Sequence, residues 1–305
     1  IIDTAGRYTT QDSDADADRK SWLAFLALLK QHRGRQPING VILAISVSDL
    51  MTMDEQSLAG HAVEIRNRLR ELHEELRIEF PVYLLFTKAD LVVGFMEYFG
   101  GLDEEVRRQV WGVTFQAKAR GESLIGEAPE EFDALATRLA QDLPERLQAE
   151  QDASSRIAIF GFPRQFNALR PLVLDFLGRV FDPSRKRTAV DLRGYYFSSG
   201  TQEGTPIDQV LGAIGRGFGG GARPHLSGSG KSFFLHDLLA ETVPPLDRPR
   251  VLDAGCGLGG TMIDLARRWG GHYVGVTLSP SQAAIGTRAI ARAGLADVVR
   301  IAVQS

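Results

Sequence analysis

Two short motifs in this 305-residue chain carry side chains suited to binding a nucleotide. Asp3 and Gly6 form an Asp-x-x-Gly sequence after two isoleucines, and Thr87-Lys88-Ala89-Asp90 follows a second apolar run. A carboxylate at the end of a strand can hold Mg²⁺ directly or through water, so Asp3 is a candidate metal ligand. Gly6 would let a backbone N–H approach a γ-phosphate without interference from a Cβ atom. The ionised Asp90 carboxylate only accepts hydrogen bonds, which suits the N1–H and amino group of guanine.

These motifs are two of the three sequence marks of a GTP-binding P-loop fold. The third, the phosphate loop Gly-x-x-x-x-Gly-Lys-Ser/Thr, would precede Asp3, so we expect the chain to begin inside a domain. Residues 299–305 have the pattern of a strand that lies at the very end of the chain, so we expect the chain to be truncated at this end as well. We therefore interpret the motif residues as the remnant of a GTP and Mg²⁺ site: Asp3, Gly6, Thr87, Lys88 and Asp90. Hydrolysis of GTP at a useful rate is not expected, because the phosphate loop supplies most phosphate contacts.

A third motif, Asp253-x-Gly255-x-Gly257-x-Gly259, places three glycines in a short turn. Such a turn alone is weak evidence, but apolar patterns predict a strand at 250–252 before it and a helix at 261–269 after it. A second strand at 273–277 and a second helix at 281–293 follow. This order predicts a Rossmann-like cofactor loop. Cys256, within the turn, is more simply a small apolar residue than a catalytic thiol.

The sequence Ser227-Gly228-Ser229-Gly230-Lys231-Ser232 resembles the end of a phosphate loop but lacks its other features. His225 stands where the first glycine is required, and no apolar strand precedes it. The glycine-rich residues 215–221 favour a flexible hinge instead, followed by a helix at 233–239.

The elements that must position these motifs alternate between strand and helix. Apolar runs predict strands at 38–46, 82–86, 156–160 and 192–197. A stripe of six apolar residues predicts a helix packed on the sheet, since it is too short for a coiled coil: Leu58, Ala62, Ile65, Leu69, Leu72 and Leu76. Between about 91 and 151 strand character disappears. We expect an α/β fold, a truncated GTPase-like parallel sheet over 1–197 with an all-helical insertion.

Other stretches complete this plan. Helices are expected around Trp22 to Leu29, Val106 to Trp111, Phe132 to Leu143 and Phe166 to Val180, with Pro171 either kinking the last or starting it. The loop Ser198-Ser199-Gly200-Thr201 can contact a guanine ring through backbone N–H groups or form a plain turn, and the sequence leaves both open. The expected domains are 1–205, a helical segment and glycine-rich linker at 206–249, and a partial Rossmann unit at 250–305.

The composition is that of a globular protein with room for two domains, at 44% hydrophobic and 24% charged residues. A net charge of −3 gives no bulk attraction to nucleic acid, and we expect none to bind. The single cysteine excludes an internal disulfide and suits a reducing compartment. The longest apolar runs, such as 41–45, are far shorter than the roughly 20 residues of a membrane helix.

Five segments, kept in order, resemble the cytoplasmic domain of the IcmF/TssM family of type VI secretion inner-membrane proteins: 3–11, 37–41, 86–90, 160–166 and 199–208. The resemblance runs from Ile1 to about Thr242. It implies a GTPase-like domain with a helical insertion at the cytoplasmic face of the bacterial inner membrane. It also implies a DotU-like protein, an outer-membrane lipoprotein and baseplate proteins as partners, and membrane anchoring through segments outside this chain.

The residues from Arg250 onward resemble the first half of an S-adenosylmethionine-dependent methyltransferase. The resemblance implies cofactor binding by Asp253, Gly255, Gly257 and Gly259. Thr277 stands where an acidic residue usually binds the ribose hydroxyls, and 276–282 is similar to the cyclopropane-fatty-acid synthase and small-molecule branch, in which Gln282 would assist. We expect the cofactor loop to keep its shape without methyl transfer, because half a core is only marginally stable.

The sequence is compatible with three functions: a secretion-complex switch or scaffold, a methyltransferase with an N-terminal extension, and a purely structural module. Coverage favours the first over the second, because about 240 residues resemble the secretion family and under 60 resemble half a methyltransferase. The change in composition at 242–248 predicts a fusion of the two, of natural or artefactual origin. Neither NTP hydrolysis nor methyl transfer is assigned to this chain.

Overall fold

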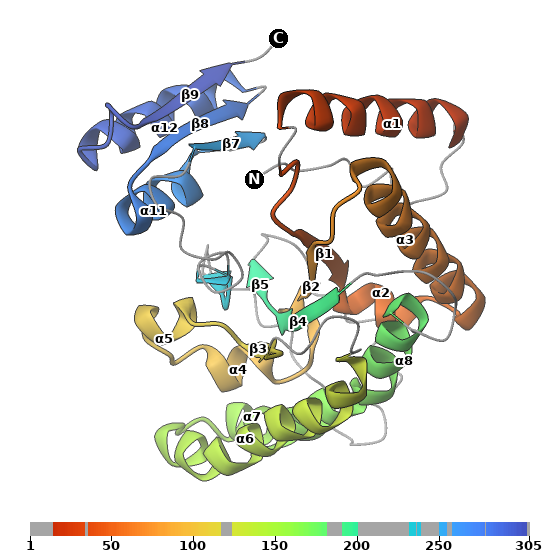
Figure 1. The fold of residues 1–305 in the computed structure, drawn as a ribbon. Helices are drawn as coiled ribbons and strands as arrows, with labels where there is room; N and C mark the ends of the chain where they lie inside the picture. Colours follow the sequence, from red (N-terminus) through yellow and green to blue (C-terminus); the bar gives the residue numbers. More distant parts are fainter. Residues whose placement is uncertain are drawn as a thin grey trace. The chain divides into compact units, whose positions relative to one another are not determined.

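The computed structural model describes residues 15–33, 36–116, 124–181, 191–200, 232–235, 237–238, 250–254, 258–277 and 279–303. They fall into two compact units, one within Thr9–Leu238 and one within Leu239–Ser305 (Figure 1). The predicted strand at Ile1–Asp3 lies outside the described residues, as does most of the expected linker. Among the described residues, we find no helix long and apolar enough to span a bilayer.

The first unit is built on a four-stranded sheet of order β1-β2-β4-β3. Three strands are parallel, as predicted: β1 (Val41–Ser46), β2 (Pro81–Thr87) and β4 (Asp191–Phe197). β3 (Gly112–Thr114) pairs antiparallel with β4. The predicted all-helical insertion is therefore wrong in one respect, because it contributes an edge strand to the sheet.

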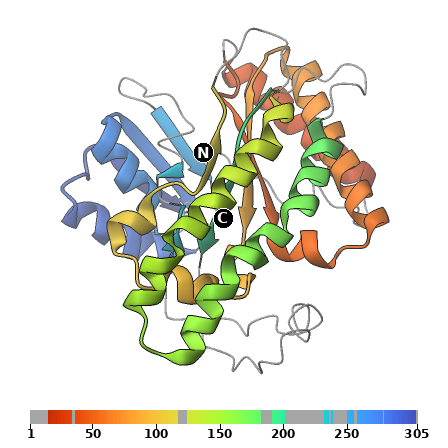
Figure 2. The ribbon, with the colours of Figure 1, turned by 90° about the horizontal axis from the view of Figure 1, so that it is seen from below.

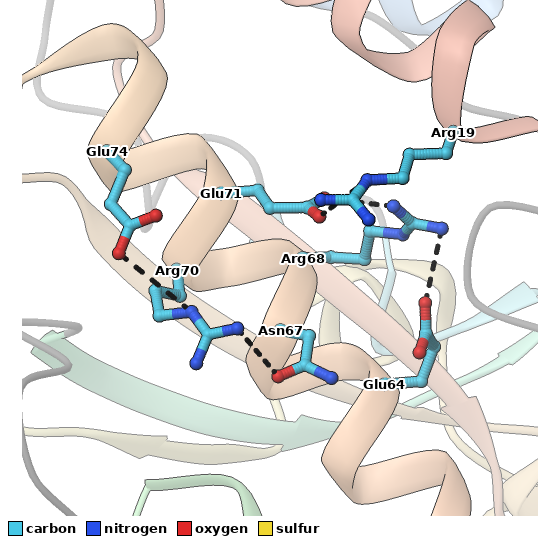
Figure 3. Close-up of polar contacts among 7 residues, drawn as sticks. All are labelled: Arg19, Glu64, Asn67, Arg68, Arg70, Glu71 and Glu74. Carbon is cyan, nitrogen blue, oxygen red and sulfur yellow. Dashed lines mark hydrogen bonds and ion pairs between the residues drawn. The ribbon is translucent and has the colours of Figure 1, made fainter. Parts of the chain in front are cut away.

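Helix α3 (Glu55–Leu76) confirms the predicted core helix. Asp54 caps its start by accepting a hydrogen bond from the Ser57 amide, and all six residues of the apolar stripe are buried. Arg68 on α3 lies between Glu64 and Glu71, at 3.2 and 2.9 Å, and Arg19 of α1 (Ala15–His32) approaches Glu71 at 3.8 Å (Figure 3). This network joins α1 to α3 beside the buried contacts.

The insertion starts with a 3₁₀ turn after β2 and ends in a long helix. Its described elements are η2 (Ala89–Leu91), α4 (Phe95–Phe99), α5 (Glu104–Arg108), β3, η3 (Ile125–Glu127) and α6 (Ala128–Ala149). The helix predicted to reach Trp111 ends at Arg108 instead. Trp111 lies next to β3, and its backbone carbonyl accepts a hydrogen bond from the Phe197 amide. Pairing with β4 therefore decides the structure here.

The predicted strand at 156–160 is wrong, because these residues lie within α7 (Ala153–Ala168). Asp152 caps this helix, and its buried residues Ile159, Phe162 and Phe166 recur at helical spacing. The local β-propensity of the isoleucines is overridden by packing against α6. α8 (Arg170–Phe181) then follows, with Pro171 in its first turn, one of the two predicted places. Figure 2 shows α6, α7 and α8 together along one side of the sheet.

Aromatic rings fill the space between these helices and the sheet. Phe197 of β4 stacks on Phe86 of β2 with ring centroids 5.1 Å apart, and Phe166 and Trp111 lie within 5.0 and 5.2 Å of it. Two tyrosine hydroxyls inside this core hydrogen-bond to backbone carbonyls of α6: Tyr98 to Leu139 at 2.7 Å and Tyr195 to Ala128 at 3.1 Å. Burial raises the pKa of Tyr98 to about 12, so it remains a neutral donor.

A short ladder extends beyond β4, where β5 (Ser199–Gly200) pairs antiparallel with β6 (Ser232–Phe233). The helix predicted from Phe233 is therefore wrong at its start. Phe234 adopts a left-handed φ of 58°, which ends the strand. Both phenylalanines are buried in the first unit, 0% and 5% exposed, although the sequence placed them beyond a linker.

The second unit confirms the predicted strand and helix order. Its described elements are β7 (Arg250–Ala254), α11 (Gly260–Trp269), β8 (His272–Thr277), α12 (Pro280–Arg292) and β9 (Val299–Val303). The three strands are parallel, in the order β7-β8-β9. Met262 and Leu265 of α11 and Ile290 of α12 form one core with Tyr273 and Val299.

Candidate functional sites

The carboxyl ends of the parallel strands in the first unit meet at one edge of the sheet. Ser46 at the end of β1 lies opposite Thr87 at the end of β2, and Phe86 lies opposite Phe197, which precedes Ser198. Ligands of open α/β sheets bind outside this edge. The parallel register therefore brings the Thr87–Asp90 motif next to the loop that follows β4.

Hydrogen bonds join these two loops directly. The Ala89 amide donates to the Ser198 carbonyl at 3.0 Å, and the Ser198 amide donates to the Phe86 carbonyl at 2.9 Å. The Ser199 hydroxyl donates to Asp90 Oδ1 at 2.5 Å. Thr87 Oγ1 approaches the Ile45 carbonyl at 3.4 Å, and Lys88, in a left-handed conformation with φ 58°, is exposed. These contacts place Thr87, Lys88 and Asp90 together in one corner at the carboxyl edge of the sheet.

Ser199 is the residue that sequence reasoning did not assign to the site. It is 0% exposed and 109 positions away from Asp90. Its only signal in the sequence was its place in a small-residue loop after a strand. Asp3 and Gly6, the other predicted residues of this site, lie outside the described part of the chain. Within the described part, His, Cys, Asp and Glu side chains form no group of three that could hold a metal ion.

The second unit also gathers its candidate residues at a carboxyl edge. Gly259 directly precedes α11 with a left-handed φ of 78°, and a Cβ there would lie 3.0 Å from Ile301 Cδ1. The buried Thr277, at the end of β8, donates through Oγ1 to Gln282 Oε1 at 2.8 Å and accepts from the Ser279 amide at 3.2 Å. Thr277 and Gln282 are thus brought together, as part of the turn that starts α12.

The backbone of Asp253 lies in β7, beside Gly275 of β8, while Gly255 and Gly257 lie outside the described residues. A cavity of about 750 Å³ in this unit opens elsewhere, around the amino ends of β8 and β9. Its lining includes His272, Tyr273 and Arg300. The cavity is therefore separate from the predicted cofactor loop and gives that loop no support.

Comparison with known families decides what the larger part of the chain is. Residues 15–248 match the IcmF-related N-terminal domain family. The chain belongs to this family. Type VI secretion system component TssM1 of Pseudomonas aeruginosa is 47% identical over 247 residues, which cover 79% of this chain and 22% of that protein. This IcmF-related chain therefore spans about a fifth of the curated relative that it matches over most of its length.

The remaining part matches a different family. Residues 246–305 match the mycolic acid cyclopropane synthetase family. Geranyl diphosphate 2-C-methyltransferase of Streptomyces coelicolor is 39% identical over 79 residues, 26% of each chain. A crystal structure of that organism's geranyl diphosphate C-methyltransferase with Mg²⁺, geranyl diphosphate and S-adenosyl-L-homocysteine is 36% identical over 23% of this chain and 27% of its own, with a TM-score of 0.22. The IcmF-related region is thus joined to a segment similar to methyltransferases, as predicted.

Proposed function

We propose that the first unit is the GTPase-like cytoplasmic part of a type VI secretion membrane complex, in which it acts as a switch or scaffold. The single observation that carries this proposal is the 47% identity to TssM1 over 79% of the chain. The two loops joined at the carboxyl edge of a mainly parallel sheet support a nucleotide-binding ancestry of the fold. We place it at the cytoplasmic face of the bacterial inner membrane, attached through other segments of its parent protein.

The proposed partners are a DotU-like inner-membrane protein, an outer-membrane lipoprotein and baseplate proteins. The outward face of α7 supports a protein contact, because Ile157 and Phe160 are 74% and 67% exposed. They lie three positions apart and therefore share one side of the helix. Neighbouring exposed apolar side chains of this size are typical of protein interfaces.

Binding to a purified DotU-like protein tests both parts of this proposal. We expect the wild-type chain to bind and the double variant Ile157→Glu, Phe160→Glu to lose at least about tenfold in affinity, since two apolar anchors become charged. Gln141→Glu, an exposed charge change on α6, should bind normally. A folded wild-type chain that fails to bind contradicts the partner assignment. Equal binding by the double variant contradicts the assignment to α7.

We further propose that Thr87, Lys88 and Asp90 form a guanine-recognition corner, with Asp3 and Gly6 as the Mg²⁺ and phosphate side of the same GTP site. The hydrogen bond from Ser199 supports this role, because it orients the carboxylate group of Asp90. We expect weak binding of GTP, weaker binding of ATP and no useful turnover. Calorimetry should show loss of the guanine preference in Asp90→Ala. Equal affinities for GTP and ATP contradict this assignment, and sustained phosphate release contradicts the view of a remnant site.

We propose a separate role for the second unit, which is to bind S-adenosylmethionine through residues 253–259, Thr277 and Gln282. The left-handed Gly259 and the Thr277–Gln282 pair support it. The proposal is limited to cofactor binding and assigns no methyl transfer to this unit. Equilibrium dialysis with labelled cofactor should show binding that Gly259→Val abolishes and Gly260→Ala retains, because a Cβ at Gly260 meets nothing within 4 Å. Methyl transfer to a lipid or small acceptor would instead favour the enzyme.

A further inference from the structure

The short segment formed by residues 232–235 and 237–238, here called the clip, returns to the first unit and packs into its aromatic core. The Phe234 amide donates to the Arg107 carbonyl at 2.7 Å, and the Asp237 amide donates to the Arg108 carbonyl at 3.1 Å. Leu238 is 2% exposed and packs with Leu85 and Tyr196. The clip is thus fixed to α5 by its backbone and to the sheet by its side chains.

Phe233 is the residue of the clip that reaches the guanine-recognition corner from two directions. Its backbone pairs with Ser199, whose hydroxyl holds Asp90. Its ring meets Phe95 edge-to-face, with centroids 5.5 Å apart and planes at 82°. Phe95 begins α4, only four residues after the η2 turn that contains Asp90. Phe233 therefore contacts the chain on both sides of the Asp90–Ser199 hydrogen bond.

The backbone of Phe234 gives an independent reason to regard the clip as more than core filling. A bulky side chain at a φ of 58° is an outlier, and such strain persists only where the surroundings enforce it. Here the ring lies 5.0 Å from Phe99 and 5.4 Å from Trp111, so contacts with the insertion hold the strained conformation. Strained residues of this kind cluster at ligand clamps and switch regions.

We propose that Phe233 is a positioning residue for the guanine-recognition corner and that the clip couples this corner to helices α4 and α5 of the insertion. The inference rests on the proposed guanine site for its functional meaning, but its geometry does not depend on a nucleotide. When the clip is docked, Ser199 is held in the β5–β6 ladder and keeps Asp90 oriented. When the clip is displaced, Ser199 loses its ladder partner and the two loops loosen together.

Amide hydrogen exchange of the full chain, measured by NMR without nucleotide, tests the coupling. In Phe233→Ala we expect the amides of Ala89 and Ser198 to exchange about tenfold faster, because both belong to the bridge between the loops. The amide of Leu139, a buried residue of α6, should be unchanged. Leu235→Ala is the matched control, since this clip residue is 41% exposed. Phe233→Leu, which keeps an apolar side chain but loses the edge-to-face ring contact with Phe95, should accelerate exchange at the same two amides by a smaller factor.

Two results overturn the proposal. One is unchanged exchange of Ala89 and Ser198 in Phe233→Ala. The other is equal acceleration at Leu139, which shows a general loss of stability. If Phe233→Ala does not fold, Phe233→Leu decides: selective acceleration at Ala89 and Ser198 supports positioning, and identity with the wild type overturns it.

A titration with GDP separates this proposal from the function on which it rests. We expect Phe233→Ala to weaken GDP binding about as much as Asp90→Ala does, and Leu235→Ala to leave it unchanged. Absence of GDP binding in the wild type defeats the guanine assignment but leaves the exchange result standing. GDP binding that Asp90→Ala weakens and Phe233→Ala does not defeats the positioning role alone.

Discussion

The polar residues at the carboxyl edges of the two units are held by hydrogen bonds whose partners lie at very different separations in the sequence. In the first unit Asp90 is held by Ser199, 109 positions away, and their approach depends on the pairing of β4 with β2 and of β5 with β6. In the second unit Thr277 is held by Gln282, five positions away, within the turn that starts α12. The first corner is therefore a product of the whole domain, and the second of one local turn. Substitutions should separate them accordingly.

The largest effect is expected from Phe197→Ala, which removes the ring at the centre of the first unit's aromatic core. Phe197 is 0% exposed and contacts Phe86, Phe166 and Trp111. We expect a loss of about 3–5 kcal/mol in the free energy of unfolding of the first unit. Denaturant unfolding followed by amide exchange should show destabilisation of β2 and β4. An equal loss of stability at β8 would contradict the view that the two units unfold independently.

A smaller effect is expected from Gly286→Ala in α12, because an added Cβ would lie 2.4 Å from Ile301 Cδ1 and 2.6 Å from the Leu258 carbonyl oxygen. Overpacking of this kind costs about 1–3 kcal/mol. Gly260→Ala, at the start of α11, meets no atom within 4 Å and serves as the control. Thermal unfolding monitored at Trp269 should report the difference. Equal stability of both variants would mean that α12 is not held against β9.

The comparison itself is tested by Ser199→Ala and Thr277→Val. Ser199→Ala removes a hydrogen bond to a carboxylate, which is worth about 1.5–3 kcal/mol, whereas Thr277→Val removes neutral bonds worth about 0.5–1.5 kcal/mol. We expect Ser199→Ala to accelerate amide exchange on both sides of its hydrogen bond, at Ala89 and Ser198. Thr277→Val should affect only the first turn of α12. If Ser199→Ala accelerates exchange only at residues next to position 199 and leaves the Ala89 amide unchanged, the first corner does not depend on long-range contacts.

The smallest effect concerns His61 of α3, whose ring lies 6.4 Å from that of Phe176 and whose Nδ1 is buried without a hydrogen-bond partner among the described residues. Burial lowers the pKa of His61 below its usual 6.5, and the charge of Asp49 only partly opposes this. The unfolded state therefore binds more protons than the folded state as pH falls through 6.5, and the first unit loses stability there. His61→Gln should remove this dependence, which amounts to less than one proton. An unchanged pH profile of the unfolding midpoint would show that His61 is not its source.

The sequence by itself determined those elements in which the apolar periodicity and the residues at the ends predict the same helix or strand. The stripe Leu58 to Leu76, capped by Asp54, gave α3 correctly, and the second unit's strand and helix order followed from its apolar runs. The two family resemblances, later confirmed, likewise rested on short ordered motifs. These features depend on neighbours in the chain, so local patterns were sufficient to find them.

Only the tertiary structure decided where local preference and packing disagree. Residues 156–160 have strand propensity but form a helix, because α7 buries Ile159, Phe162 and Phe166 against its neighbours. The sequence pattern predicted helices at Trp111 and Phe233, yet these residues hydrogen-bond to β4 and β5 as part of sheet ladders. The hydrogen bond between Ser199 and Asp90 could not be foreseen either, since it exists only once three distant segments have paired. Long-range pairing and side-chain burial outweigh local propensities of about 1 kcal/mol or less per residue, and no single segment contains that information.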